Sequence, residues 1–243
     1  MTLTYIYHSG YLIEYQDFSV IIDFWKDSDD RHVQQLLHQS VSPIYVLASH
    51  WHPDHFSREI MKWRDNSKNI KYILSSDIIE NLKRTGIFSD KHDIVFLSKG
   101  DIYSDDKLDI KAFGSTDCGI SFLIETNGRK VFHAGDLNNW HWDEDPTSTP
   151  DEIRNAGQSY LREIDDLKAV APSLDVAMFP VDKRLGTNYM LGAQQFVETI
   201  KTSVFAPMHF GSDYVSAAAF RPFAEKAGCN FIEWTKTGQS IDI

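Results

Sequence analysis

The stretch that decides the fold of this chain reads Ser49-His50-Trp51-His52-Pro53-Asp54-His55-Phe56. It places three imidazoles and a carboxylate within six residues, directly after the apolar run Ile44 to Ala48, which is typical of a buried strand. Neutral imidazole and carboxylate are the ligands that divalent metals such as zinc prefer. Because side chains at these spacings on a tight loop cannot all reach one ion comfortably, the stretch predicts two metal ions about 3.5–4 Å apart.

Composition narrows the class of protein. Of the 243 residues 42% are hydrophobic, which is enough for one large core or at most two small ones. The net charge of -11 argues against nucleic acid as the main partner, because phosphate binding requires a basic surface. A small-molecule substrate, including an anionic one, is compatible with this charge, because metal cations invert the local field.

Membrane and export signals are missing from the sequence. No run of ~18 apolar residues exists, so no spanning helix and no membrane partner are expected. The N-terminus lacks the basic region and apolar core of a signal peptide. Two cysteines, Cys118 and Cys229, are too few for a disulfide framework, and reduced thiols are the better expectation. These features predict a cytoplasmic protein.

Strands and helices alternate along the whole chain, without repeats or a flexible linker. This pattern predicts one domain, residues 1–243, of layered sheets covered by helices. Asp29 or Asp30 is expected to cap a helix through Leu36 and Leu37. Further helices are predicted over residues 150–168, 191–199 and 215–227.

Two later segments share the form of the first, an apolar strand that ends in a candidate ligand. Asp136 follows the strand Lys130 to Ala134, and His209 lies just past the strand Val204 to Ala206. Asp23 ends an early strand in the same way and is expected to orient the metal-binding stretch. Considered alone, each is as compatible with an ordinary turn or loop residue. Because ligands at strand ends converge at one edge of a sheet, the full set indicates a metal site.

This constellation resembles the metallo-β-lactamase-fold hydrolase superfamily. The resemblance rests on Asp23, the stretch His50 to His55, Gly135-Asp136 and His209, in the family's order over nearly the whole chain. It implies an α/β fold, a four-layer αββα sandwich with the metals at one edge. It also implies that His50 and His52 bind the first metal, that Asp54, His55 and His209 bind the second, and that Asp136 bridges them. A looser resemblance links the chain to the branch that contains ascorbate-phosphate lactonase-like enzymes.

One departure from the family pattern concerns the first metal. The family supplies a further histidine between the main stretch and the Gly-Asp segment, where this chain has Ser115 or Thr116. The first metal is therefore expected to bind more weakly, unless another group substitutes. The candidates are Asp117 and Cys118, nearby in sequence, and His133 and His141, on either side of Asp136.

The expected chemistry is metal-assisted hydrolysis of a small ester, lactone or phosphodiester. Two cations lower the pKa of a shared water from 15.7 toward ~7, and the hydroxide so formed attacks the substrate. Asp54 and Asp136 are expected to orient this nucleophile. His133 or His141 is expected to protonate the leaving group, although His133 is equally compatible with a packed strand residue.

The substrate cleft is expected to be lined by Trp51, Trp140 and Trp142, because exposed indoles in loops usually wall a pocket. Packing of these tryptophans under a cover helix is the alternative. Lys183 and Arg184 either hold a substrate phosphate or carboxylate or form a solvated pair.

Zn²⁺, as one or two ions, is the expected cofactor, with Mn²⁺ and Fe²⁺ as alternatives. A rival hypothesis is a single-metal protein of this fold with a structural or ligand-sensing role. Redox use of a di-iron site would require a flavin-binding partner domain that 243 residues do not include.

Overall fold

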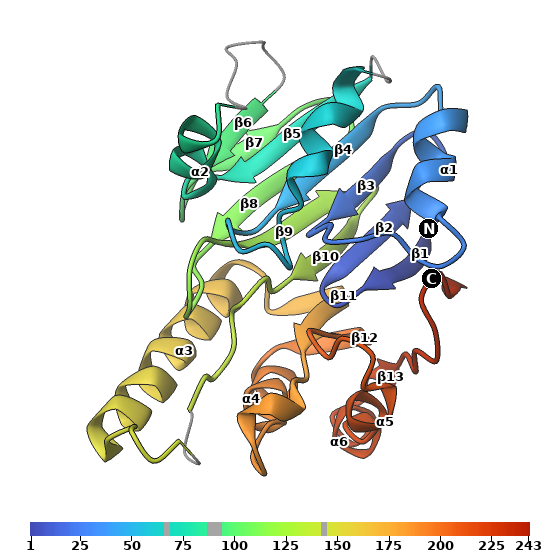
Figure 1. Ribbon diagram of the computed structural model, residues 1–243. Coiled ribbons are helices and arrows are strands. Elements are labelled where there is room, and N and C mark those ends of the chain that lie inside the picture. Colours follow the sequence, from blue (N-terminus) through green and yellow to red (C-terminus); the bar gives the residue numbers. More distant parts are fainter. Residues whose placement is uncertain (66–68, 87–93, 142–144) are drawn as a thin grey trace. The chain divides into compact units, whose positions relative to one another are not determined.

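The computed structural model describes residues 1–65, 69–86, 94–141 and 145–243, and Figure 1 shows its elements. In these residues the chain forms two compact units, each built on its own seven-stranded sheet. Unit 1 comprises Met1–Ser98 and Trp234–Ile243, and unit 2 comprises Lys99–Glu233. Two mixed sheets with interspersed helices confirm the α/β class. The assignment of residues 1–243 to one domain stays a prediction.

The sheet of unit 1 has the strand order β14-β1-β2-β3-β4-β5-β6. The strands from β3 to β6 are parallel to one another, whereas β1, β2 and β14 pair antiparallel. Every residue of β4 is buried, as its continuous apolar sequence predicts for a central parallel strand. The strand bounds are β1 (Thr2–Tyr7), β2 (Gly10–Glu14), β3 (Ser19–Ile22), β4 (Ile44–Ala48), β5 (Ile70–Ser75), β6 (Ile94–Leu97) and β14 (Ser240–Asp242).

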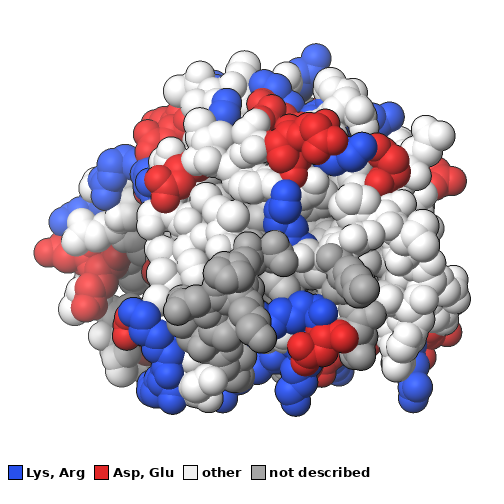
Figure 2. All heavy atoms as spheres, turned by 90° about the horizontal axis from the view of Figure 1, so that it is seen from above, with Lys and Arg blue, Asp and Glu red and all other residues white. Residues whose placement is uncertain are grey.

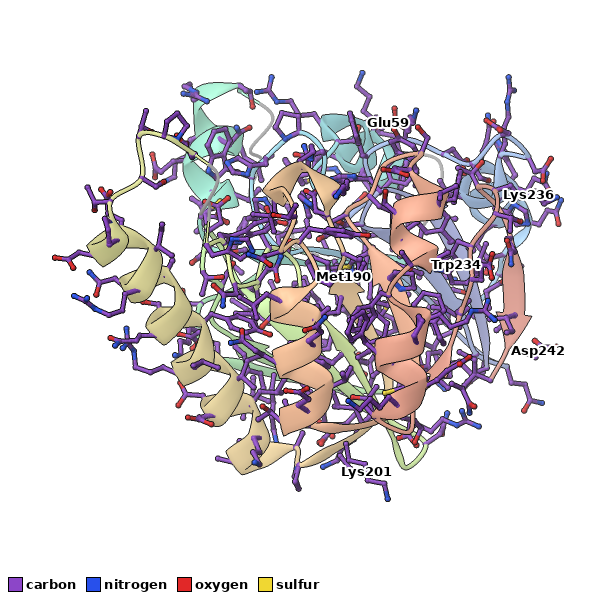
Figure 3. All side chains as sticks on the ribbon, turned by 90° about the horizontal axis from the view of Figure 1, so that it is seen from below. Glu59, Met190, Lys201, Trp234, Lys236 and Asp242 are labelled. Atoms are coloured by element: carbon purple, nitrogen blue, oxygen red, sulfur yellow. The ribbon has the colours of Figure 1, made fainter. Side chains whose placement is uncertain are left out.

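The C-terminal segment of the chain belongs to unit 1. The indole N–H of Trp234 donates a hydrogen bond to the hydroxyl of Tyr11 at 2.9 Å, and both side chains are buried. Beyond Trp234 the chain passes Lys236 and ends in β14, which carries Asp242 (Figure 3). The segment therefore completes the sheet on the side of β1.

Three helices cover one face of this sheet: α1 (His32–Gln39), the 3₁₀ helix η1 (Arg58–Asp65) and α2 (Ile78–Arg84). Alternate residues of β4, Ile44, Val46 and Ala48, share a buried apolar cluster with side chains from all three helices. Because successive side chains of a strand point to opposite faces of the sheet, these alternate residues of β4 all contribute to the core on this face.

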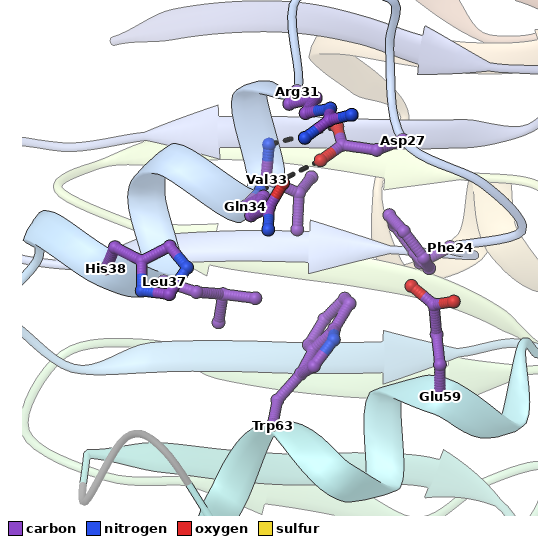
Figure 4. A pocket seen from close by; sticks show the side chains of 9 residues that line it. All are labelled: Phe24, Asp27, Arg31, Val33, Gln34, Leu37, His38, Glu59 and Trp63. Atoms are coloured by element: carbon purple, nitrogen blue, oxygen red, sulfur yellow. Dashed lines mark hydrogen bonds between the residues drawn. The ribbon is translucent and has the colours of Figure 1, made fainter.

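The cap predicted for α1 was wrong. Asp27, rather than Asp29 or Asp30, accepts hydrogen bonds from the backbone N–H groups of Val33 at 3.1 Å and Gln34 at 2.8 Å (Figure 4). Arg31 precedes the helix in a left-handed conformation, with φ of 54°, so the chain reverses and brings Asp27 back over the helix N-terminus. The three carboxylates are too close in sequence to be told apart without this turn.

The sheet of unit 2 has the strand order β13-β12-β11-β10-β9-β8-β7. The strands from β10 to β13 are parallel, and β7 to β10 pair antiparallel. Asn127 and Gly128 both have positive φ between β9 and β10, as the tight turn of a β-hairpin with Asn-Gly at its centre requires. The strand bounds are β7 (Ile102–Ser104), β8 (Asp109–Phe113), β9 (Ser121–Thr126), β10 (Arg129–His133), β11 (Ser173–Pro180), β12 (Lys201–Met208) and β13 (Asn230–Phe231).

The helices of unit 2 are α3 (Pro150–Val170), the 3₁₀ helix η2 (Lys183–Leu185), α4 (Leu191–Thr199), α5 (Tyr214–Ala218) and α6 (Arg221–Lys226). Helices α3 and α4 lie side by side, and α4, which begins just after Met190, packs on β11 and β12 (Figure 3). The prediction of a single helix over residues 215–227 was wrong. Pro222 lies in the first turn of α6 and lacks the N–H that a continuous helix needs, so the chain breaks between Ala218 and Arg221.

In the part of the chain that the structure describes, no helix combines the length and the apolar character needed to cross a membrane. Cys118 and Cys229 are not joined in a disulfide.

Candidate metal centre

The parallel strands β3 and β4 of unit 1 end at the same edge of their sheet. Asp23 follows β3, and the metal loop, defined here as residues 49–56, follows β4. The fully buried carboxylate of Asp23 accepts hydrogen bonds from the backbone N–H of Ser49 and from Nδ1 of His55, each at 2.7 Å. Asp23 therefore orients the metal loop, as predicted from its position at a strand end.

The hydrogen bonds of His50 and His55 determine which ring nitrogen of each carries the proton. The Ser49 hydroxyl donates its one proton to Asp23 at 2.7 Å, so the contact of 2.9 Å between Ser49 Oγ and His50 Nδ1 has the imidazole as donor. Asp23 Oδ2 can only accept, so Nδ1 of His55 is a donor too. Nε2 of both His50 and His55 is thereby left with the lone pair that a metal requires.

The rings of the metal loop are spaced as ligands of a common site. Nε2 of His50 lies 3.0 Å from Nδ1 of His52, and the ring centroids of His50 and His55 lie 4.2 Å apart. Two ligands of one tetrahedral zinc ion, with bonds of ~2.0–2.1 Å, lie about 3.3–3.5 Å from each other. The nitrogens of His50 and His52 lie a few tenths of an ångström closer than this spacing, and the imidazole-rich donor set of unit 1 is of the kind that suits zinc.

Asp54 is the carboxylate of the metal loop and is kept ionised. Burial raises its pKa, but the neighbouring imidazoles of His8 and His55 outweigh burial and hold the pKa of Asp54 well below its usual range. His8 Nε2 lies 3.4 Å from Asp54 Oδ2. The carboxylate form, which is the form that binds metals, is the one that its surroundings favour.

In unit 2 three adjacent parallel strands end at one edge and carry three polar side chains. Asp136 follows β10, Asp182 follows β11 and His209 follows β12. His209 Nε2 lies 3.2 Å from Asp136 Oδ1, and His209 Nδ1 donates to Asp182 Oδ2 at 2.9 Å. The predicted pair of Asp136 and His209 is thus brought together at a sheet edge, and Asp182 orients the imidazole.

Sequence reasoning missed Asp182, although it has the same signal of a carboxylate directly after an apolar strand. Arg184 binds it in a bidentate fashion, with Nη2 2.6 Å from Oδ2 and Nε 2.9 Å from Oδ1. Burial raises the pKa of Asp182, but hydrogen bonds from His209 and Arg184 outweigh it and hold the pKa well below its usual range. Asp182 Oδ2 can only accept, so Nδ1 of His209, which also lies 3.2 Å from Arg184 Nη2, is the donor in the contact with this carboxylate.

A cavity of about 350 Å³ in unit 2 opens beside this cluster. Trp140 lies in its wall: its indole N–H donates to the carbonyl of Asp136 at 2.8 Å, and its ring lies 5.6 Å from that of His209. The cavity is lined by Thr116, Asp117, Asp136, Trp140, Ala156, Asp182, Arg184 and His209. Two residues predicted to contact substrate, Trp140 and Arg184, therefore lie at one cavity.

Lys183, also predicted to contact the substrate, is not among the residues that line this cavity. Lys183 holds its ammonium group 4.7 Å from the ring centroid of Tyr189. Trp51, in unit 1, is 39% exposed and contacts His52 edge to face. Trp142 lies outside the described residues.

The two predicted proton donors are both buried in unit 2. His133, on β10, accepts a hydrogen bond at Nδ1 from the backbone N–H of Gly135 at 3.1 Å, which shapes the turn before Asp136. His141 donates from Nε2 to the carbonyl of Asn188 at 3.1 Å. Their catalytic role stays a prediction.

Thr116, which lies in the region where the family pattern has a histidine, makes hydrogen bonds to the backbone of another loop. The hydroxyl of Thr116 donates to the carbonyl of Asn138 at 2.5 Å and accepts from its N–H at 3.0 Å. Cys118 Sγ lies 3.9 Å from a carboxylate oxygen of Asp117. Thr116 therefore ties down the loop that follows Asp136.

Several residues of the candidate site have an unfavourable, left-handed backbone conformation. Among the described residues, five other than glycine have positive φ, and three of them are His8, Asp23 and His209. Such conformations cost free energy and cluster at functional sites.

Comparison with known proteins places the chain in a family. The family model of the beta-lactamase superfamily domain matches residues 2–149. A protein of Desulforamulus reducens named UPF0173 metal-dependent hydrolase is 25% identical over 100% of both chains.

Two solved structures cover nearly the whole chain. Igni18, a metallo hydrolase from the archaeon Ignicoccus hospitalis, superposes with a TM-score of 0.67 at 17% identity, over 99% of this chain and 97% of its own. The metallo-beta-lactamase fold protein YhfI from Bacillus subtilis superposes with a TM-score of 0.63 at 14% identity, over 99% and 98%. The chain therefore belongs to the beta-lactamase superfamily and has the metallo-β-lactamase fold.

Proposed function

We propose that this protein is a metal-dependent hydrolase. The proposed ligands are His50, His52, Asp54 and His55 of unit 1 with Asp136 and His209 of unit 2. One observation carries the proposal: His50, His55 and His209 each donate Nδ1–H to an oxygen fixed by the fold, which leaves Nε2 for a cation. This pairing of imidazole with an oriented acceptor is the usual surrounding of a metal-ligating histidine.

Bound divalent cations supply a Lewis acid for the substrate and a water activated as nucleophile at neutral pH. The carboxylates of Asp54 and Asp136 accept hydrogen bonds and orient the attacking water. His133 or His141 delivers a proton to the leaving group, since imidazole is the side chain that most often serves as general acid. Asp23 and Asp182 hold the ligating imidazoles in place.

The proposed substrate is a small ester, lactone or phosphodiester that carries an anionic group. Trp140 offers a flat apolar wall and Arg184 a guanidinium at the cavity that also contains Asp136 and His209. A guanidinium recognises carboxylate and phosphate groups. On the face shown in Figure 2, basic and acidic side chains lie interspersed, which suits a small-molecule substrate better than a nucleic-acid backbone.

We propose zinc as the ion, because imidazoles outnumber carboxylates in the ligand set, with Mn²⁺ and Fe²⁺ as alternatives. We also propose that residues 1–243 act as one domain in the cytoplasm, where the reduced thiols of Cys118 and Cys229 are stable.

A second candidate function is a single-metal protein with a structural or ligand-sensing role. The observation that favours it is the Thr116 hydroxyl, which is bound to the Asn138 backbone where the family places a histidine. A first metal with fewer ligands would bind weakly.

The test uses wild type and Asp136→Ala, with metal content measured by mass spectrometry and hydrolysis measured on ester, lactone and phosphodiester panels. We expect wild type to hydrolyse at least one class and Asp136→Ala to lose both metal and rate. Full metal content and full rate in Asp136→Ala would refute the bridging role. One tightly held ion per wild-type chain without hydrolysis would support the single-metal function.

A further inference from the structure

His8 lies in the turn between β1 and β2, at the edge of the unit 1 sheet that carries Asp23. Its backbone is left-handed, with φ of 58°, and its side chain is almost fully buried. The turn is held tightly: the His8 N–H donates to the hydroxyl of Tyr5 at 2.9 Å, and a Cβ on Gly10 would lie only 3.1 Å from the carbonyl oxygen of Asp23. A buried imidazole on strained backbone is costly unless it does something that a smaller residue cannot.

The imidazole of His8 is directed at the metal loop. Its Nε2 lies 3.4 Å from Asp54 Oδ2, and its ring meets that of His55 edge to face with centroids 5.8 Å apart. One ligand atom from each of His8, Asp54 and His55 lies within 4.8 Å of the others. All three residues belong to unit 1, so this arrangement depends only on the internal structure of that unit.

These distances suit ligands of one ion better than a hydrogen bond. A good hydrogen bond between a ring N–H and a carboxylate spans about 2.7–2.9 Å, which is well short of the distance between His8 and Asp54. Neighbouring ligands of tetrahedral zinc lie about 3.3–3.5 Å apart, which the separation of 3.4 Å matches. The ring of Trp25 also contacts that of His8 edge to face, with centroids 5.6 Å apart.

We propose that His8 is a direct ligand of the cation that Asp54 and His55 hold; this inference rests on the proposed function. Neither the metal loop nor the strand ends of unit 2 include His8, so it adds a nitrogen donor to the assigned set. A site richer in imidazole selects zinc over manganese, because imidazole suits zinc whereas carboxylate and water suit manganese.

The test compares the full-length wild type with His8→Gln and with His38→Gln as the matched control. The glutamine amide introduced by His8→Gln reaches about as far as Nε2 and can still donate a hydrogen bond to Asp54, but it is a poor zinc ligand. His38 lies on α1 of the same unit, beside the cavity in Figure 4 and away from the metal loop. Zinc affinity is measured by competition with a chromophoric chelator, and the Co²⁺-substituted proteins are compared by visible absorption.

We expect His8→Gln to lower zinc affinity by more than about 100-fold, which exceeds the roughly 10–100-fold loss typical of a residue that only orients a ligand, and to change the Co²⁺ spectrum. His38→Gln should match wild type in both. If His8→Gln binds zinc like wild type with an unchanged Co²⁺ spectrum, His8 is only a hydrogen-bond partner and the inference is wrong. A wild type that binds no metal would instead refute the proposed function itself.

Folding is checked by thermal unfolding of the metal-free proteins. If His8→Gln fails to fold, His8→Asn replaces it, because asparagine tolerates left-handed backbone. The spectrum of His8→Asn at saturating Co²⁺ then decides between the two outcomes in the same way.

Discussion

The carboxylate of Asp23 accepts a hydrogen bond from Nδ1 of His55 at 2.7 Å, and neither side chain is accessible to solvent. A third buried group, the Ser49 hydroxyl, donates to the same carboxylate oxygen. With the backbone N–H of Ser49, three donors thus converge on one buried carboxylate, which fixes the tautomer of His55 and, through the Ser49 hydroxyl, that of His50.

Replacing Asp23 by Asn should weaken metal binding without touching a ligand. An amide NH₂ facing His55 would force its Nδ1 to accept, so the proton would move to Nε2, the proposed metal-binding nitrogen. We expect zinc affinity to fall by roughly 10–100-fold. Chelator competition measures it, and the conservative Asp23→Glu variant, which keeps the acceptor, should recover part of the loss. Equal affinities of wild type and Asp23→Asn would show that the tautomer does not matter.

Metal binding should stabilise the folded protein. Zinc at about 100 times its Kd should add roughly 2.7 kcal/mol to the free energy of unfolding, provided the unfolded chain does not bind it. For a chain of this size that corresponds to an increase in Tm of roughly 5–10 °C. Calorimetry with zinc and with EDTA measures the difference.

The double variant His50→Ala, His52→Ala should lose most of that increase, because it removes both nitrogens of the contact at 3.0 Å. An unchanged increase in the double variant would mean that zinc stabilises the protein from another site.

The parts of the site that could be predicted from the sequence are those marked by a motif within one short segment. The metal loop is contiguous, and Asp136 and His209 each follow an apolar strand directly. The helices at 150–168 and 191–199 could be predicted for the same reason, since helical periodicity and capping are properties of short segments.

What escaped prediction depends on contacts between distant segments. Asp182 follows an apolar strand as Asp136 does, but its role beside His209 becomes apparent only when β11 is known to lie between β10 and β12. His8 reads as a turn residue until the turn is seen packed against the end of β3. In both cases the order of strands in the sheet decides the role, and local sequence does not encode that order.

The capping box of α3 should make stability depend on pH in acid. Glu152 accepts hydrogen bonds from the backbone N–H of Thr149 at 2.8 Å and from its hydroxyl at 2.7 Å, and these bonds hold the pKa of Glu152 below its usual value of 4.5. A lowered folded-state pKa means that the stabilisation is fully present above the usual pKa and is lost as pH falls through the folded-state value.

Wild type should therefore be more stable than Glu152→Gln at about pH 7, and the difference should shrink toward about pH 3, as urea unfolding at each pH would measure. Thr149→Ala should cost about 1 kcal/mol through loss of the cap. In the Thr149→Ala background the pH dependence of the Glu152→Gln effect should largely disappear, and its persistence would mean that another group causes it.

Two glycines contact the loop after Asp136 from different helices, and alanine should have opposite effects at them. In α4, a Cβ on Gly192 would lie 1.9 Å from Asn138 Oδ1 and 2.8 Å from the backbone nitrogen of Asn139, so the loop must shift. In α3, a Cβ on Gly157 would lie 3.7 Å from the Asn139 side chain, an ordinary contact.

Gly192→Ala should therefore destabilise the protein by about 1–3 kcal/mol through overpacking. It should also weaken metal binding, because the loop that it displaces begins at Asp136. Gly157→Ala should stabilise the protein by about 0.5–1 kcal/mol, because alanine is the better helix former. Urea unfolding and chelator competition on both variants measure these effects. If Gly192→Ala loses stability but binds zinc like wild type, the loop accommodates the methyl group without moving Asp136, and the α4 contact supports the fold alone.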